Sequence, residues 1–480
     1  MILRAFLMVL FFLALPARLP QLHAQDLKVQ ITVPSDDATH VLIAATYSPG
    51  SSRLSFLNNY GTALGLGDRI ESLELSGKNG EPQGAERIAP GEFRAASPGT
   101  HFHYSVRMGQ PEKAADMAHI SWLANGMGYL MLADLLPRFD STVPASHIAV
   151  DFTLPPGWGV ASTIRANNGH YLVDDLDKTI FFVGKGLREK SRQVGSMELS
   201  FVTATKWRFS DDQALKIAER VVKEYDRRIA PNPNKRAAIF LSSFPAADSE
   251  PHWSAETRGS TVAIVFSEGE EGRNALAQLG ILLTHELFHL WVPNGLALSG
   301  DYDWFFEGFT LYQALRTAVR LGFINFDEYL NTIGRVYQAY LSFPDRDLFS
   351  LPEASKRRFT GGSSVVYDKG MLLAFIYDLA LRARSDGKLS VEDIYRALFQ
   401  RPRGAPEDAN QAIIAALSAP DGMKELTQSY IVDHASIELE RLVSQYGLKI
   451  ETSGPEKHLV VDRELNRGQS RLLRSLGFRH

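Results

Sequence analysis

The 480-residue sequence predicts an α+β protein with more than one domain: an N-terminal antiparallel β-sandwich-like domain, followed by a mostly α-helical domain with a small sheet. Three observations lead to this prediction. Short apolar runs separated by turn residues fill residues 25–205, and apolar residues recur with a helical period over most of residues 206–450. The chain is also longer than one ordinary core supports, while its 45% apolar and 22% charged residues are typical of a globular protein.

Residues 1–24 differ from the rest of the chain. Arg4 precedes an apolar run from Ala5 to Pro16, and a more polar stretch then ends at Ala24. This pattern predicts a secretory signal peptide, so we expect an exported protein that is periplasmic or secreted. No later segment has the ~18 apolar residues of a membrane span, and we therefore expect no stable membrane anchor after signal cleavage.

The composition excludes several kinds of chemistry. The chain has no cysteine, which rules out disulfides, thiol catalysis and thiolate metal sites. The formal net charge of −4 gives no reason to expect nucleic acid as a partner. Neither composition nor pattern predicts an oligomeric state.

The β domain, residues 25–205, is predicted from short runs rich in β-branched and aromatic residues. Clusters of Pro, Gly and Ser at residues 49–52 and 155–157 are expected to form turns between strands. The clearest predicted strands are residues 41–45, 102–106, 147–152 and 179–183.

The pattern changes after Trp207, where the predicted catalytic domain, residues 206–450, begins. Ser210 followed by two aspartates is typical of a helix start. Residues 451–480 have weak periodicity and scattered arginines, and we expect them to form a short C-terminal tail. The predicted elements are a helix at 214–228, strands at 236–241 and 260–266, and helices over most of residues 269–446.

One stretch of the helical region carries candidate chemistry. His285 and His289 lie four residues apart, with Glu286 between them. On a helix this spacing brings both imidazoles to one face, roughly 6 Å apart, so that they can bind one metal ion while Glu286 acts as a general base. Glu307, after a loop containing Pro293, supplies a third ligand. Two histidines, one carboxylate and one open position form the donor set of hydrolytic zinc.

The motif alone is only moderately specific, because a helix with two solvated or core histidines can have the same spacing. Its context favours a metal site. The apolar run from Ala275 to Leu283 leads directly into His285, which predicts a buried helix that ends in the ligands. Two histidines and two glutamates also rarely converge on a core-facing site without a metal.

With Glu307 placed, the chain resembles the gluzincin metallopeptidases, the thermolysin-like group that combines HExxH with a distal glutamate. Within this group it is similar to the glycyl aminopeptidase family. The resemblance covers about residues 206–450 and implies a thermolysin-like catalytic domain with Zn²⁺ as cofactor. The segments that carry it are His285 to Trp291 (HELFHLW), Trp304 to Tyr312 (WFFEGFTLY), Val366 to Gly370 (VYDKG), and Asp378 to Arg382 with the turn that follows.

The resemblance also implies roles for two further residues. Tyr367 falls where the family places a tyrosine that hydrogen-bonds the oxyanion of the tetrahedral intermediate. Glu256 falls where the family binds the α-ammonium group of its substrate, in a stretch that leads into the strand 261–266, which we expect to edge the cleft. Such a charge-assisted contact favours aminopeptidase over endopeptidase action.

The sequence departs from the family pattern around Glu256. Trp253 and Ser254 replace the usual glycines, and Thr257 replaces the histidine that usually follows. The family often carries a PDZ-like domain after the catalytic domain, and residues 451–480 are too short to form one.

The sequence therefore predicts a zinc metallopeptidase that acts on peptides, most simply an aminopeptidase. An endopeptidase remains open because of the altered residues around Glu256. An exported binding protein with a structural zinc is a third possibility. His101 and His103 could bind a metal, but a structural or solvated pair is the simpler interpretation. Asp301 and Asp303 could support a zinc-binding histidine, but solvation in the loop is the simpler role.

Overall fold

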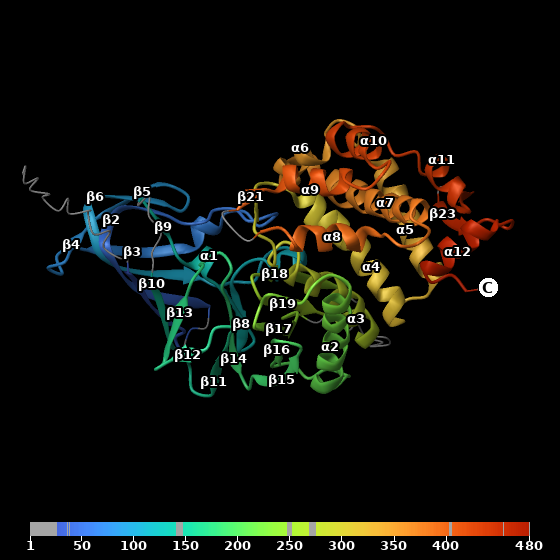
Figure 1. The fold of residues 1–480 in the computed structure, drawn as a ribbon. Helices are drawn as coiled ribbons and strands as arrows, with labels where there is room; N and C mark the ends of the chain where they lie inside the picture. Colours follow the sequence, from blue (N-terminus) through green and yellow to red (C-terminus); the bar gives the residue numbers. More distant parts are fainter. Residues whose placement is uncertain are drawn as a thin grey trace, which may run out of the picture.

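The β-rich part and the helical part of the chain lie side by side in the computed structural model (Figure 1). The predicted signal peptide, residues 1–24, lies outside the described residues. The structure describes residues 26–35, 37, 39–140, 147–246, 252–267, 275–402, 406–454 and 456–479.

The N-terminal region contains a ten-stranded sheet with the order β12-β13-β10-β1-β2-β6-β3-β4, to which β5 adds beside β6 and β9 beside β2. The pairing is antiparallel, as predicted, except that β1 runs parallel to β10. The strands are β1 (Asp26–Thr32), β2 (His40–Ser55), β3 (Ile70–Ser76), β4 (Pro82–Gln83), β5 (Ala85–Ala89), β6 (Glu92–Arg107), β9 (Arg138–Phe139), β10 (His147–Thr153), β12 (Ala166–Asn167) and β13 (His170–Val173).

The predicted turn at residues 49–52 is wrong, because β2 continues through it. The pairing of β2 with β6 shifts register between Thr46 and Ser51, so the Pro49-Gly50 pair is accommodated as an irregularity within a long strand. Gly50 has φ +102, a conformation that side chains disfavour. A bulge of this kind gives the same local sequence signal as a turn.

A four-stranded sheet, order β11-β14-β8-β7, lies between two other sheets. In β14, Phe181 packs into the core shared with the ten-stranded sheet, whereas Phe182 packs into a core shared with strands of the next sheet. Both faces of this sheet are therefore buried, and the β region is a stack of sheets rather than a simple two-layer sandwich. The strands are β7 (Trp122–Ala124), β8 (Met127–Met131), β11 (Trp158–Ala161) and β14 (Ile180–Lys185).

A five-stranded sheet forms the base of the helical part, with the order β15-β16-β17-β19-β18. Its first two strands lie inside the predicted β domain, but β16 pairs in parallel with β17. Its opposite edge is β18, not the strand at 261–266 that we expected, because β19 lies between β17 and β18. The strands are β15 (Arg188–Val194), β16 (Met197–Thr203), β17 (Arg236–Ser243), β18 (Trp253–Arg258) and β19 (Thr261–Phe266).

Helices cover the other face of this sheet. The helix α2 (Asp211–Arg228) begins where the sequence predicts, because two reciprocal hydrogen bonds cap its first turn. The Ser210 hydroxyl oxygen accepts a hydrogen bond from the Gln213 amide, and the Gln213 side-chain oxygen accepts one from the Ser210 amide. Behind α2, one large apolar core joins the sheet to the helical bundle. The longer helices are α3 (Ala275–Glu286), α4 (Thr310–Leu321), α5 (Phe326–Ser342), α7 (Gly370–Arg384), α8 (Val391–Phe399), α9 (Ala409–Ser418) and α12 (Arg467–Ser475).

Short helical segments connect these helices and carry several candidate residues. A 3₁₀ turn, η3, extends α3, and four π-helical segments interrupt the α-helical pattern of the described residues. Such segments are frequent at functional sites. They are η3 (Leu287–Leu290), η4 (Trp304–Phe309), η5 (Arg358–Gly362), η6 (Val365–Lys369) and η7 (Gln428–Val432). The other short helices are α1 (Leu132–Leu135), α6 (Leu351–Lys356), α10 (Lys424–Thr427) and α11 (Leu439–Val443), with the 3₁₀ turns η1 (Leu66–Arg69), η2 (Ala114–Asp116) and η8 (Ser444–Tyr446).

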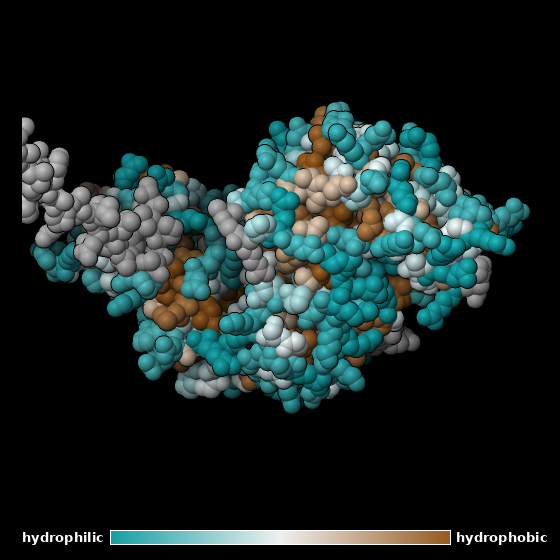
Figure 2. Space-filling model, viewed as in Figure 1, coloured by the Kyte–Doolittle hydropathy of each residue, from teal (hydrophilic) through white to brown (hydrophobic). Residues whose placement is uncertain are grey.

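The predicted C-terminal tail is folded onto the helical part. It contributes to the hairpin of β22 (Leu448–Ser453) and β23 (Glu456–Val461), and β23 packs on α5. The buried Arg316 donates to the carbonyl of Leu476 just after α12, at 2.5 Å. Polar residues cover most of the face of the helical part seen in Figure 2. No helix in the described part of the chain is long and apolar enough to cross a membrane.

Candidate active site

Three side chains of the helical part converge on one point. His285 belongs to the last turn of α3, His289 to η3 and Glu307 to η4. The Nε2 atoms of the two histidines are 3.1 Å apart, and Glu307 Oε2 lies 3.6 Å from His285 Nε2 and 3.8 Å from His289 Nε2. Within the described ranges, this is the one cluster of three or more such donors that could hold a metal ion.

Close packing of two helical segments places Glu307 beside the segment that carries Tyr367. A Cβ on Gly308 would lie 2.5 Å from the Val366 carbonyl oxygen and 2.6 Å from the Gly370 Cα. Only glycine allows η4 to approach η6 and the start of α7 so closely. Gly308 and Gly370 are thus required by the same close contact between the two segments, which the sequence alone did not reveal.

A backbone hydrogen bond orients one histidine of the cluster, His289. Because a carbonyl can only accept, His289 Nδ1 donates to the Val292 oxygen at 2.9 Å, which leaves Nε2 as the ring nitrogen that faces the cluster. Burial would raise the pKa of Glu307, but the hydrogen bond with His285 and the charges of His289 and Arg358 outweigh it and hold the pKa at about 2. Glu307 is therefore ionised at neutral pH.

The donor set fits zinc. Two imidazole nitrogens and one carboxylate oxygen, all buried or nearly so, face a common point. Zinc in hydrolytic sites takes three protein ligands of these types and keeps one further position for water or substrate. The cluster therefore has the ligands predicted for zinc, in an arrangement that one ion can satisfy.

Glu286 lies beside this cluster, at the end of α3. The hydroxyl of Thr257 donates to Glu286 Oε2 at 2.8 Å and contacts the Glu286 backbone oxygen at 3.0 Å. One carboxylate oxygen is thus held by β18, and Oε1 is left for a proton-transfer role. Thr257, noted in the sequence only as a departure from the family, is the residue that orients the candidate base.

Tyr367 lies in η6 next to Arg358, a residue that sequence reasoning did not select. Arg358 donates to the Tyr367 hydroxyl, contacts Glu307 Oε1 at 2.9 Å and donates to Asp303 Oδ1 at 2.9 Å. Burial and the nearby Glu307 charge raise the pKa of Tyr367 well above its ordinary value, so its hydroxyl keeps the proton needed for a hydrogen-bond donor. The solvated role predicted for Asp303 is therefore wrong, because its carboxylate binds Arg358, and it contacts Arg358 rather than a zinc-ligand histidine.

Glu256 lies on the edge strand β18, one residue before Thr257. Its Oε1 accepts from the Tyr60 hydroxyl at 2.8 Å, and its Oε2 lies 3.2 Å from His119 Nε2. The Arg258 guanidinium stacks 4.3 Å above the Tyr60 ring, with Nε 3.6 Å from Glu256 Oε1. Two of these partners come from the N-terminal β region, so the two parts of the protein meet at Glu256.

Ser254 explains part of the departure from the family pattern. Its hydroxyl donates to the Ala115 oxygen at 2.6 Å and accepts from the Ala118 amide at 2.9 Å. These bonds fasten β18 to the turn that presents His119. Trp253, in contrast, is 59% exposed at the start of the strand.

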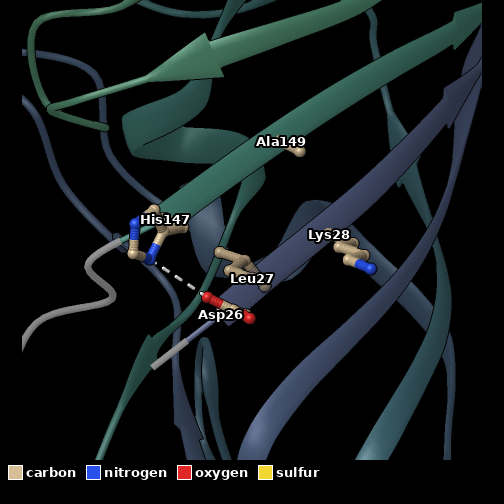
Figure 3. Close-up of a pocket in the computed structure, with 5 residues that line it drawn as sticks. All are labelled: Asp26, Leu27, Lys28, His147 and Ala149. Atoms are coloured by element: carbon tan, nitrogen blue, oxygen red, sulfur yellow. Dashed lines mark ion pairs between the residues drawn. The ribbon is translucent and has the colours of Figure 1, made fainter. Parts of the chain in front are cut away.

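Other candidates lie apart from this site. His101 and His103 face neighbours in β6 and β3, and neither belongs to the metal-type cluster. An open pocket of about 300 Å³ lies at the start of β1 and β10, where Asp26 and His147 form an ion pair of 3.2 Å (Figure 3). Both of these side chains are more than half exposed. This pocket belongs to the ten-stranded sheet and offers no comparable donor cluster.

Comparison with known families decides the identity of the chain. A family model described as the peptidase M61 N-terminal domain matches residues 15–180, and one described as M61 glycyl aminopeptidase matches residues 278–373. The second match contains both histidines, the glutamate between them, Glu307 and Tyr367. The chain belongs to the M61 peptidase family. This M61 protein is thus a metallopeptidase, and the predicted resemblance to the glycyl aminopeptidases is confirmed.

Solved structures similar to this M61 peptidase show the same fold. An aminopeptidase N family protein from Idiomarina loihiensis has a TM-score of 0.73 at 16% identity and covers 89% of this chain and 79% of that one. An M1 zinc metallopeptidase from Deinococcus radiodurans has a TM-score of 0.54 at 16% identity, over 87% of this chain and 95% of that one. The search of curated proteins returned no match. The predicted fold class, a β-rich region followed by a helical region, is confirmed by these similarities.

Proposed function

We propose that this M61 peptidase is an exported zinc aminopeptidase, in which His285, His289 and Glu307 hold the zinc ion. The ligand set and the family support zinc peptide hydrolysis. A mutant of the Deinococcus radiodurans M1 enzyme, whose fold is similar, is described as bound to the substrate Tyr-Ser-Ala, which supports peptides as the substrate class. Export rests on the predicted signal peptide alone.

The side chains around the cluster are placed for hydrolysis. When bound, zinc supplies the positive charge that polarises the attacking water and the scissile carbonyl. Glu286 takes a proton from that water through Oε1 and passes it to the leaving amine, while Thr257 keeps its other oxygen in place. Tyr367, protonated at neutral pH, donates a hydrogen bond to the carbonyl oxygen as its negative charge develops.

The observation that carries the aminopeptidase proposal is the position of Glu256. It lies on the edge strand one residue before Thr257, which touches the candidate base, and its charge is close enough to Tyr367 to help raise the pKa of that hydroxyl. Tyr60 and His119 stand against this carboxylate from the N-terminal region and leave its side chain 20% exposed. We infer that a free ammonium group binds here and that these two side chains limit the space beyond it.

One observation favours the endopeptidase alternative. Both oxygens of Glu256 already have partners, and the buried Arg258 offsets part of its charge. A carboxylate has acceptor capacity for more than one donor per oxygen, so an ammonium can still bind, but its attraction is weaker than to an isolated carboxylate.

The deciding experiment compares matched peptides with free and acetylated N-termini, using the natural chain, Glu286→Gln and Glu256→Gln. We expect cleavage of the free-amine peptides only, no cleavage by Glu286→Gln, and a KM about tenfold higher in Glu256→Gln, since a hydrogen bond to a charged group contributes about 1.5–3 kcal/mol. Cleavage of both peptide sets would instead establish an endopeptidase. Bound zinc without turnover on a broad peptide panel would support a non-catalytic binding protein.

A further inference from the structure

The carboxylate of Glu307 uses its two oxygens for different purposes. Oε2 faces the two histidines, at 3.6 and 3.8 Å, whereas Oε1 lies 2.9 Å from a terminal nitrogen of Arg358. A carboxylate held at one oxygen presents the other in a fixed direction. Arg358 therefore controls which oxygen of Glu307 the metal meets.

The same nitrogen of Arg358 also donates to the hydroxyl oxygen of Tyr367. A terminal guanidinium nitrogen carries two N–H groups, and here it donates to the Tyr367 oxygen and forms an ion pair with Glu307 Oε1. Because the phenol oxygen accepts this bond, its single O–H proton must point elsewhere. That proton is free for the oxygen of a bound substrate.

The position of Arg358 is itself determined by its surroundings. Its other terminal nitrogen donates to Asp303 Oδ1 at 2.9 Å, just before η4 begins. The guanidinium lies 5.0 Å from the Phe359 ring and 5.2 Å from the Tyr367 ring, measured to the centroids. A planar fork with donors in several directions can make these contacts at once, and a lysine ammonium on its flexible stem cannot reproduce them.

We infer that Arg358 is a positioning residue of the site, one that ties the metal ligand Glu307 to the hydrogen-bond donor Tyr367. This inference rests on the proposed function for the role of Tyr367, but its effect on Glu307 holds for any zinc-binding role of the cluster. Arg358 couples two parts of the reaction that are otherwise separate: metal binding and stabilisation of the carbonyl oxygen.

The test measures zinc affinity and turnover separately in Arg358→Ala and Arg358→Lys. Arg357 is the matched control, since this neighbouring arginine is exposed and stacks on the Phe349 ring at 5.1 Å, outside the site. Zinc affinity is measured on the purified full chain by competition with a chromogenic chelator. We expect both Arg358 variants to bind zinc about tenfold or more weakly, as is typical when a residue that supports a ligand is lost, and Arg357→Ala to bind as the natural chain does.

Turnover at saturating zinc isolates the second role. We expect Arg358→Ala to lower kcat by about 10- to 100-fold in the natural background, with KM little changed. In a Tyr367→Phe background the same change should lower kcat by less than about threefold, because the hydroxyl that Arg358 orients is absent.

Two results would overturn the inference: unchanged zinc affinity in Arg358→Ala, or an equal loss of kcat with and without the Tyr367 hydroxyl. Asp303→Asn, which keeps the shape of the side chain that fixes Arg358, should shift both quantities in the same direction by a smaller factor. If Arg358→Ala fails to fold, Asp303→Asn provides the test. If the natural chain hydrolyses no peptide, the proposed function fails, while the zinc titration still decides whether Arg358 positions Glu307.

Discussion

The metal-type cluster and the surroundings of Glu256 lie at one site but are assembled differently. The candidate ligands His285, His289 and Glu307 lie within one short stretch of the helical part, on α3, η3 and η4, and their donor atoms face one another. The partners of Glu256 come from two parts of the chain: Arg258 from its own strand, and Tyr60 and His119 from the N-terminal β region. Tyr60 is 196 residues away in sequence.

Under the proposed function, this difference separates the residues that perform the reaction from those that select the substrate. The cluster depends on the packing of the helical bundle, whereas Glu256 depends on the contact between the two parts of the protein. Changes in the N-terminal region can therefore alter substrate selection without touching the metal ligands. Four predictions test this separation.

Removal of the metal should have the largest effect. We expect a strong chelator to lower turnover by roughly 1000-fold or more, since a catalytic metal supplies several kcal/mol of charge stabilisation, and added zinc to restore it. The measurement is turnover before and after dialysis against the chelator. Persistent turnover in zinc-free protein would contradict the assignment of the cluster as the catalytic centre.

The close contact between η4 and η6 can be broken by Gly308→Ala. The added Cβ would lie 2.5 Å from the Val366 carbonyl oxygen, and this backbone atom can move away only if the packed segments shift. We expect a loss of about 2 kcal/mol in the free energy of unfolding, together with weaker zinc binding, because Glu307 moves with η4. Gly109→Ala is the control, since a Cβ there meets nothing within 4 Å. Equal unfolding midpoints for the two variants would show that the contact is not tight.

Tyr60→Phe tests whether the β region acts on substrate selection. It removes the hydroxyl that bonds Glu256 but keeps the ring under Arg258. We expect KM for free-amine peptides to rise by less than the tenfold expected for Glu256→Gln, because the carboxylate keeps its charge and loses only one group that holds it in place, with kcat and zinc affinity unchanged. A fall in zinc affinity instead would mean that the two halves of the site are not separable.

Thr257→Val should have the smallest effect. It removes the hydroxyl that holds Glu286 Oε2 and preserves the side-chain shape. A neutral donor contributes about 1 kcal/mol, so we expect kcat to fall about fivefold with KM unchanged. Steady-state kinetics on one free-amine peptide is sufficient. An unchanged kcat would show that the hydrogen bond from Thr257 does not contribute to the action of Glu286.

The sequence predicted much of the helical part because its signals are local. The capped start of α2 at Ser210 and the spacing of His285 and His289 both depend on residues within one or two helical turns. The bulge in β2 was mistaken for a turn for the same reason, since Pro49 and Gly50 give one local signal for two structures.

The surroundings of the site could not be predicted in this way. Arg358 looks like any exposed arginine in sequence, and its role appears only once η5 packs beside η4 and η6. The edge position of β18 likewise depends on the order of strands in the sheet, which short-range patterns do not specify.

By itself, the sequence determined that a β-rich region precedes a helical region, and it determined the metal-type donor set and the candidate base, because each follows from spacing along a helix or alternation along a strand. The tertiary structure alone decided that Thr257 orients Glu286, that Tyr60 and His119 enclose Glu256, and that Arg358 joins Glu307 to Tyr367. These contacts join separate elements, and their formation depends on how sheets stack and helices approach, which the burial of apolar surface over the whole chain controls.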